Sequence, residues 1–241
     1  MAAFMHPVRT NACLCSVSCY AAWKIHEQTE NNYMNILYND PHIVVVDKPG
    51  GLLAVPGRGP DKHDCVTARV RQQFPEMIEQ PSVHRLDMYT SGVMVLAKTS
   101  EAHRNLSIQF EQRQTVKVYI AVIDGLLAAD KGRIELKFRL DIDNRPYQIF
   151  DPDHGKIGIT LWETIRIENN TTRIRMQPIT GRTHQLRIHA AHEQGLGIPI
   201  VGDSLYGNGK EGDQMMLHAA ELTLNHPHTG DTMLFQSNVP F

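Results

Sequence analysis

Three absences narrow the class of this 241-residue chain. No uninterrupted apolar run reaches about eighteen residues, the length that a membrane-spanning helix requires, so we expect no such helix. Only four cysteines occur and three lie in the first nineteen residues, so disulfides cannot hold a fold together and we expect a reducing, cytoplasmic setting. A basic excess is also missing. The formal net charge is −2, which counts mildly against binding of nucleic acid through phosphates alone.

Regular patterning is present from Ile36 onward, whereas residues 1–32 show no periodicity. We interpret residues 1–32 as a disordered extension, or as the product of a start codon assigned upstream of Met34, and residues 33–241 as one domain. Strands outnumber helices and no β-α-β rhythm recurs, so the pattern predicts an α+β fold. The expected strands are about 43–46, 52–55, 93–97, 116–123, 133–139, 159–168 and 172–178, and the expected helices about 66–74, 100–113 and 183–193.

Reactive side chains are most concentrated in residues 82–92, which read Ser-Val-His-Arg-Leu-Asp-Met-Tyr-Thr-Ser-Gly. Charged side chains on a loop that leads into a buried strand are unfavourable unless they are paired. This makes His84, Arg85 and Asp87 candidates for a functional site. On residue types alone, a surface turn with an ion pair between Arg85 and Asp87 explains the segment equally well.

The order of residues in this segment resembles the catalytic motif of the RluA family of pseudouridine synthases. That motif is His-Arg-Leu-Asp, two residues, Thr-Ser-Gly, and an apolar strand that ends in Ala-Lys, as Ala97-Lys98 does here. Further blocks resemble the family in the right order, so that the resemblance covers about residues 36–241. They are Asp47-Lys48-Pro49-Gly50-Gly51-Leu52, Lys117-Val118-Tyr119-Ile120-Ala121, residues 180–189, residues 202–207, Leu217-His218-Ala219 and His226-Pro227.

The resemblance implies a fold, a reaction and a substrate. The fold is a central mixed, mostly antiparallel sheet flanked by helices and loops, with a catalytic cleft. The reaction isomerises uridine to pseudouridine in structured RNA and needs no cofactor, because substrate and product have the same oxidation level. Residues 52–58 and 144–146 are similar to the compact, single-domain branch of the family, which has no S4-like RNA-binding domain. This branch implies two substrates, a tRNA anticodon stem-loop and a 23S rRNA hairpin, and no obligate protein partner.

The resemblance also implies three catalytic residues. Asp87 is the essential carboxylate, which either attacks C1′ of the ribose or removes the 2′ proton. Arg187 keeps Asp87 ionised, and Tyr119 stacks on the uracil with a phenol able to shuttle a proton. Simpler interpretations stay open. The alternatives are that Tyr119 packs at a sheet edge and that Arg187 forms an ion pair on a helix surface.

Local positive charge supports the RNA hypothesis where the net charge does not. Arg85 is suited to fill the space left by an extruded uridine, because a guanidinium is planar and stacks on bases. Its alternatives are an ion pair with Asp87 or a contact with a phosphate. One arginine cluster comprises Arg166, Arg173, Arg175, Arg182 and Arg187, a second basic cluster comprises Arg58, Lys62, Arg69 and Arg71, and the predicted RNA-binding residues are Arg58, His84, Arg85, Arg182 and His184. Either cluster is alternatively an ordinary solvated face.

Competing functions find less support in the sequence. Cys13, Cys15 and Cys19 have no second ligand pair at zinc-finger spacing, and the histidines at 184, 189 and 192 follow no metal-binding order, so we expect no metal. A glycoside hydrolase needs paired acids about 5–10 Å apart, and no comparable motif supplies a partner for Asp87. A non-catalytic RNA-binding module and an enzyme of the same family with a single RNA target remain as alternatives.

Overall fold

The computed structural model describes residues 33–59 and 62–241. The chain divides into two units, Met1–Tyr33 and Met34–Phe241, and the fold described below is that of the second. The extension expected at residues 1–32, with its three cysteines, lies outside the described residues. Within residues 33–59 and 62–241, no helix has both the length and the apolar character needed to cross a bilayer.

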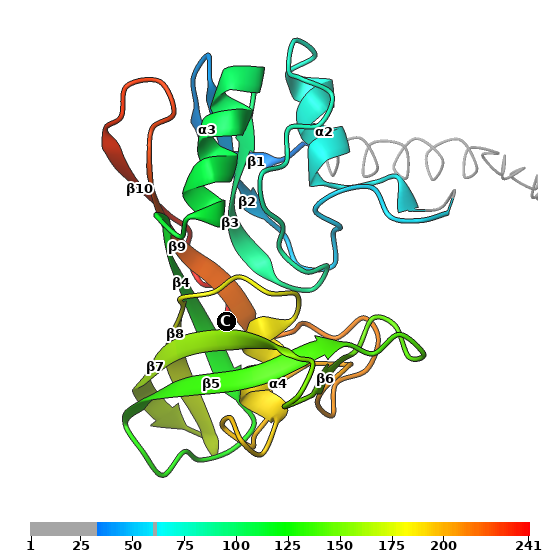
Figure 1. The fold of residues 1–241 in the computed structure, drawn as a ribbon, viewed down its shortest axis with the longest axis vertical. Coiled ribbons are helices and arrows are strands. Elements are labelled where there is room, and N and C mark those ends of the chain that lie inside the picture. The colour runs from blue at the N-terminus through cyan, green and yellow to red at the C-terminus, as the bar shows by residue number, and fades with distance from the viewer. Residues whose placement is uncertain (1–32, 60–61) are drawn as a thin grey trace, which may run out of the picture. The chain divides into compact units, whose positions relative to one another are not determined.

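A large, mostly antiparallel sheet forms the framework (Figure 1). Its strands run in the order β1-β2-β3-β9-β4-β8-β7-β5-β6, and β10 pairs with β9. Among the described strands only β3 and β9 pair in parallel. The bounds are β1 (Asn35–Asn39), β2 (Ile43–Lys48), β3 (Ser91–Ala97), β4 (Val116–Ile123), β5 (Lys131–Leu140), β6 (Gln148–Phe150), β7 (Lys156–Glu168), β8 (Thr171–Pro178), β9 (Leu217–Asn225) and β10 (Thr232–Gln236).

Helices α2 (Val66–Gln73) and α3 (Ser100–Glu111) cover opposite faces of β2 and β3. Alternate residues of β2 therefore enter different cores. Val44 packs with Val70 of α2, whereas Val45 packs with Leu106 of α3. A strand buried on both faces has no polar side to present, which explains the continuous β-branched run in β2.

The other half of the sheet is covered on one face only, by α4 (Gln185–Ala191) (Figure 1). In β5, buried Leu136 and Phe138 alternate with exposed Glu135 and Lys137. The buried set packs against Ile188 of α4. The strand therefore alternates between apolar and charged residues, as expected when one face meets solvent.

Two expected elements need correction. Residues 52–55 form no strand, only an isolated bridge between Leu53 and Cys65, because Gly51 adopts a left-handed φ of 84° just before them and Pro56 follows. The expected helix at 183–193 is shorter, since α4 spans Gln185–Ala191. His184, at its N-cap, has a left-handed φ of 54°, which a helical residue does not adopt.

Candidate active site

Sheet topology brings the Asp87 loop close to Tyr119, although β3 and β4 are not neighbours. Asp87 lies four residues before β3, and Tyr119 lies on β4. Ala219 of β9 pairs with Gly92 of β3 on one side and with Tyr119 on the other. Neighbouring strands lie about 4.8 Å apart, so Gly92 and Tyr119 are separated by roughly 10 Å across this row.

Glycine is required at position 92 for this arrangement. Its φ is +111°, and a Cβ added there would lie 2.2 Å from the carbonyl oxygen of Ala219. Any side chain would therefore push β3 away from β9. The close approach fixes where the Asp87 loop enters the sheet.

Arg187 reaches the same place from α4. Its Nη1 lies 3.8 Å from Oδ2 of Asp87. Its Nε and Nη2 donate to the two carboxylate oxygens of Asp203, at 2.7 and 2.6 Å. Arg187 and Asp203 are buried, at 2% and 0% exposure, so the interpretation of Arg187 as a surface-paired helix residue is wrong. The two-pronged bond to Asp203 fixes the plane of the guanidinium and leaves Nη1 turned toward Asp87.

Electrostatics keep this arginine charged. Desolvation by itself would lower the pKa of Arg187, but hydrogen bonding and charge from Asp203, with the charge of Asp87, raise the pKa above its usual value. The Asp203 carboxylate accepts further hydrogen bonds from the backbone N–H groups of Leu205 and Tyr206. A buried ion pair with these additional hydrogen bonds is stable in its charged form.

Gln185 anchors the start of α4 to β7. Its amide nitrogen donates to the carbonyl of Ile159 and to Oγ1 of Thr160, both at 3.0 Å. Its amide oxygen accepts hydrogen bonds from Thr180 at 2.7 Å and from the backbone N–H of Arg182 at 3.2 Å. The helix that carries Arg187 is therefore fixed to the sheet.

His184 lies on the other side of Asp87, with Nε2 4.0 Å from Oδ1 of Asp87. Its Nδ1 is 2.9 Å from the hydroxyl of Tyr206, which already accepts the backbone N–H of Gln148. That hydroxyl still has its own proton to donate, and donation to Nδ1 would put the His184 proton on Nε2, facing Asp87. Burial lowers the pKa of His184, although the negative charge of Asp87 acts in the opposite direction. The lowered pKa favours the neutral ring.

Tyr119 is half-buried and packs against the apolar clusters on both sides of the sheet junction. Burial first, and then the negative charge of Asp87, raise the pKa of the Tyr119 phenol above its usual value. The phenol is therefore protonated at neutral pH. Tyr119 is thus a packing residue whose neutral hydroxyl lies within electrostatic range of Asp87.

Lys48 holds the Asp87 loop in place. Its side chain is fully buried and its ammonium donates to the carbonyls of Pro49, Met88 and Thr90 at 2.9, 2.9 and 2.7 Å. Burial lowers its pKa to about 7, with the charge of Asp87 acting in the opposite direction. In the sequence, Lys48 was interpreted only as part of a turn. Its position at the end of a buried strand is the feature that could have identified it as a buried residue.

The predicted RNA-binding residues are spread more widely. Arg85 and Arg58 are exposed, and Arg85 forms no ion pair with Asp87 in the described part of the chain. Arg182 donates from Nε to the carbonyl of Ile157 at 3.0 Å. His84 is fixed within the fold, because its Nε2 accepts the backbone N–H of Val95 at 3.1 Å and its ring stacks on Phe110 with centroids 4.5 Å apart.

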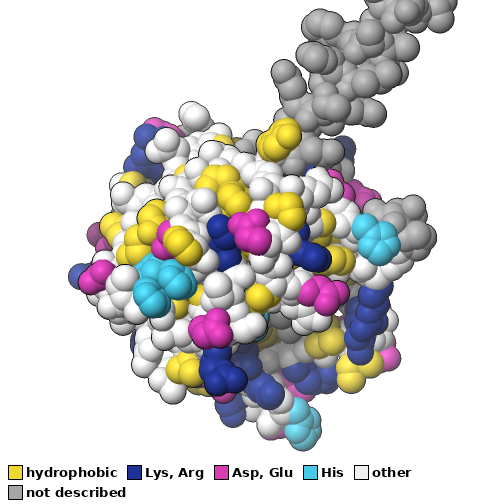
Figure 2. All heavy atoms as spheres, turned by 90° about the horizontal axis from the view of Figure 1, so that it is seen from above, with side chains coloured by type: hydrophobic (Ala, Val, Ile, Leu, Met, Phe, Trp, Pro, Cys, Tyr) yellow, Lys and Arg dark blue, Asp and Glu magenta, His cyan; other side chains and the backbone are white. Residues whose placement is uncertain are grey.

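The first arginine cluster is largely paired within the protein. Arg166 bonds Glu168, Arg175 bonds Glu163, and Arg173 donates to the carbonyl oxygen of Phe241 at 2.6 Å. In the second cluster, Arg69 pairs with Asp64, while Arg58, Lys62 and Arg71 are exposed. Figure 2 shows basic and acidic side chains interspersed on the face at the top of Figure 1, rather than one continuous basic surface.

The histidines singled out as possible metal ligands lie in different environments. His189 is buried with its ring edge-on to Phe138, and Nδ1 of His192 accepts the backbone N–H of Gln194. Over residues 33–59 and 62–241, no group of three or more His, Cys, Asp or Glu side chains has the geometry to hold a metal ion.

Comparison with known proteins identifies the family. The profile of the RNA pseudouridylate synthase family matches residues 42–192. The chain belongs to this family. It is 44% identical over 212 residues to the dual-specificity RNA pseudouridine synthase RluA of Yersinia pestis, covering 86% of this chain and all of the relative. It is 41% identical over 213 residues to the protein of the same name from Escherichia coli K12, covering 87% and 94%.

Solved structures of pseudouridylate synthases share the fold. Human RNA pseudouridylate synthase domain containing 1 superposes with a TM-score of 0.71 at 26% identity, covering 87% of this chain and 85% of that one. These findings confirm the predicted α+β pseudouridine synthase fold. They also confirm the predicted activity. As a pseudouridylate synthase, the protein is an isomerase that acts on RNA and converts uridine to pseudouridine.

Proposed function

We propose that Asp87, Tyr119 and Arg187 carry out this isomerisation, with residues 33–241 as the catalytic domain. The observation that supports the assignment best is the guanidinium of Arg187, clamped by Asp203 and turned so that Nη1 lies 3.8 Å from the Asp87 carboxylate. A guanidinium held at that distance attracts the carboxylate and fixes its direction. Attack on C1′ and removal of the 2′ proton both use a carboxylate oxygen of Asp87.

Tyr119 accounts for the movement of protons. Cleavage of the bond between C1′ and N1 leaves the uracil with a negative charge that the neutral phenol of Tyr119 can protonate. After rotation, C5 bonds to C1′ and must lose its proton, which returns the phenol to its neutral form. The net change is transfer of one proton from C5 to N1. The raised pKa of Tyr119 fits this cycle because the phenol both begins and ends protonated.

We further propose two classes of substrate, a tRNA anticodon stem-loop and a 23S rRNA hairpin. Support comes from relatives named as dual-specificity synthases, which are 41–44% identical along almost their whole length. Both RNAs belong to the translation machinery, so we expect the enzyme in the cytoplasm. The net charge of −2 indicates that the protein recognises these RNAs through local contacts rather than through overall charge.

Pseudouridine mapping of tRNA and rRNA tests both parts of the proposal. Cells that lack the gene should lose the modification in the anticodon loop and in the large-subunit hairpin. Wild-type protein should restore both, whereas the Asp87→Ala protein should restore neither although it still binds RNA. Loss at one RNA alone would reduce the enzyme to a single target. Restoration by Asp87→Ala would overturn the catalytic assignment.

A further inference from the structure

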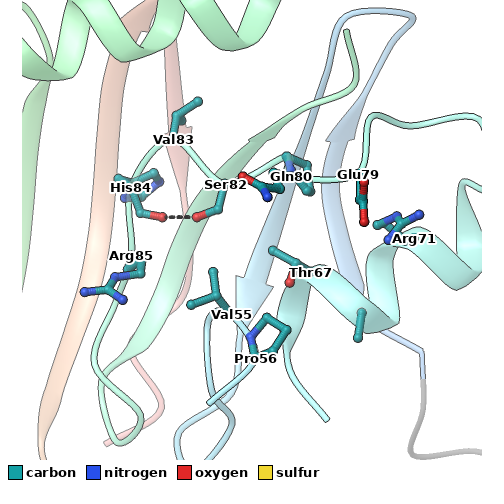
Figure 3. A pocket seen from close by; sticks show the side chains of 12 residues that line it. Val55, Pro56, Thr67, Arg71, Glu79, Gln80, Ser82, Val83, His84 and Arg85 are labelled. Carbon is teal, nitrogen blue, oxygen red and sulfur yellow. Dashed lines mark hydrogen bonds between the residues drawn. The ribbon is translucent and has the colours of Figure 1, made fainter. Parts of the chain in front are cut away.

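A pocket of about 680 Å³ lies beside the Asp87 loop, and the proposed reaction does not use it (Figure 3). It lies between α2 and the chain segment 79–85. Arg85 lines it and is only two residues from Asp87, which limits the separation of their Cα atoms to about 7 Å. The pocket is therefore next to the site where the target uridine must be bound.

The walls of the pocket suit a nucleobase. Val55, Pro56 and Val83 provide apolar surface for the faces of a flat ring, and Gln80 provides an amide that can contact its edge. A pocket of several hundred Å³ that combines apolar and polar lining groups is typical of small-ligand sites. Figure 3 shows Gln80 above Val55 and Pro56, with Thr67 between them in this view.

The two ends of the pocket carry charge. Figure 3 shows Arg71 and Glu79 near each other at one end and Arg85 at the other. Exposed Arg58 and Lys62 lie on the loop that continues from the pocket wall, where the N–H of Gly57 donates to the carbonyl of Lys62 at 2.8 Å. Positive groups at the rim favour a ligand whose backbone is negative, as that of RNA is.

Extrusion of the target uridine makes another base available. A uridine that leaves its stack removes a stacking partner from its neighbours in the loop, and single-stranded bases are bound by stacking and by contacts to their edges. We propose that the pocket between α2 and residues 79–85 binds a second unstacked base of the same RNA. This proposal rests on the proposed function and adds a specificity site to it.

The polar groups also indicate which bases fit. The Glu79 carboxylate only accepts hydrogen bonds, whereas the Gln80 amide both donates and accepts. A base with an exocyclic amino group offers a donor at the border of its pairing edge to Glu79. The only pairing-edge donor of uracil, N3–H, lies between two carbonyl oxygens that would repel the carboxylate. We therefore expect the pocket to prefer adenine, cytosine or guanine over uracil.

Hairpin RNAs with an abasic site at each unpaired loop position in turn test the proposal with full-length protein. A stacked base contributes about 1–3 kcal/mol, so one abasic position besides the target should lower kcat/KM of the wild type by about tenfold. The Glu79→Ala/Gln80→Ala double variant keeps the apolar walls and loses the contacts to the base edge. It should lose about fivefold on intact RNA and should discriminate less against that abasic RNA. Glu193→Ala/Gln194→Ala, an exposed Glu-Gln pair beyond the far end of α4, is the matched control and should behave as wild type.

The outcomes separate the two proposals. If the wild type forms pseudouridine but shows no sensitive abasic position, or if the double variant keeps the kcat/KM of the wild type, the pocket does not bind a base. If the wild type forms no pseudouridine in the anticodon stem-loop or in the 23S rRNA hairpin, the proposed substrates are wrong, and the pocket is not what failed. Both substituted side chains are exposed, so loss of folding does not complicate the double variant.

Discussion

Replacing Lys48 by methionine should impair catalysis far more than folding. The buried ammonium donates three hydrogen bonds to carbonyl oxygens, two of them at Met88 and Thr90 in the Asp87 loop. Methionine is similar in length and apolar, so the core stays filled while these bonds are lost. The Asp87→Ala experiment removes the carboxylate, whereas this variant keeps the carboxylate and releases the loop that aims it.

Two opposing free-energy terms set the effect on stability. The carbonyl of Met88 keeps its bond from the N–H of Gly51 at 2.9 Å, but those of Pro49 and Thr90 lose this donor. Two unsatisfied carbonyls cost about 2–6 kcal/mol together. Against this, the fall in the pKa of Lys48 from 10.5 to about 7 means that its burial costs about 5 kcal/mol at neutral pH. The terms nearly cancel, and the stability of the variant should lie within about 3 kcal/mol of the wild type.

Catalysis has no such compensation. A displacement of about 1 Å at a reacting group can lower the rate by about a hundredfold, and we expect a fall of that order in kcat. Single-turnover formation of pseudouridine in a hairpin RNA measures the rate, and urea unfolding measures the stability. Lys137→Met is the control, because Lys137 is exposed and also donates to a carbonyl, that of Pro152 at 3.1 Å. A kcat within a factor of about two of the wild type would refute the role of Lys48.

The difference in stability between the wild type and Lys48→Met should also change with pH, in a direction that the pKa of Lys48 determines. The pKa of Lys48 is lower in the folded protein, about 7, than in the unfolded chain, about 10.5. Between these values the unfolded chain binds one proton more, so this group makes stability rise with pH, by at most about 1.4 kcal/mol per pH unit. The stability of the wild type relative to Lys48→Met should therefore increase from pH 7 upward. A constant difference over this range would contradict the burial of the charge.

Three further substitutions test other parts of the structure. Asp203→Asn leaves the Arg187 guanidinium buried without its counter-charge and should reduce the unfolding free energy by about 3–5 kcal/mol, while a loss below about 1 kcal/mol would contradict the clamp. Gly92→Ala places a Cβ 2.2 Å from a backbone oxygen of β9, so its Tm should fall much further than that of Gly230→Ala, where φ is also positive but nothing lies within 4 Å. Equal Tm values would show that β3 and β9 can separate freely. Tyr119→Phe should lower kcat by about 10²–10⁴-fold with RNA affinity unchanged in a gel-shift assay, and full activity would exclude the phenol as proton carrier.

Sequence patterns predicted the elements whose burial is uniform along their length. The continuous apolar run in β2 and the alternation of apolar and charged residues in β5 reflect packing on two faces and on one, so both strands lie where expected. Residues 52–55 were mistaken for a strand because all four are apolar and lie between two turn signals, although only Leu52 and Ala54 are buried. They are buried against α2 without pairing to a neighbouring strand. Apolar alternation reports burial, and pairing depends on partners far away in the sequence.

In the candidate site, too, local motifs could be predicted from the sequence, whereas contacts between residues far apart in the sequence could not. The motif around Asp87 and the strand around Tyr119 could be recognised from their residues, but the partners that hold them could not. Asp203 lies sixteen residues after Arg187 and acts through a contact that no spacing rule encodes. Lys48 looked like part of a turn because its target carbonyls belong to backbone forty residues away. Charge counts were similarly ambiguous, since Arg175 is satisfied by Glu163 on the neighbouring strand.

The parallel contact between β3 and β9 consists of two residue pairs, Ser91 with His218 and Gly92 with Ala219. The carboxylate of Asp87 is attached to one side of this seam and the guanidinium of Arg187 to the other. A slip of one residue along the seam would carry the carboxylate about 3.3 Å, nearly the distance that now separates the two groups. The spacing between the carboxylate and the guanidinium is thus determined at the middle of the sheet, by the backbone of β3 and β9.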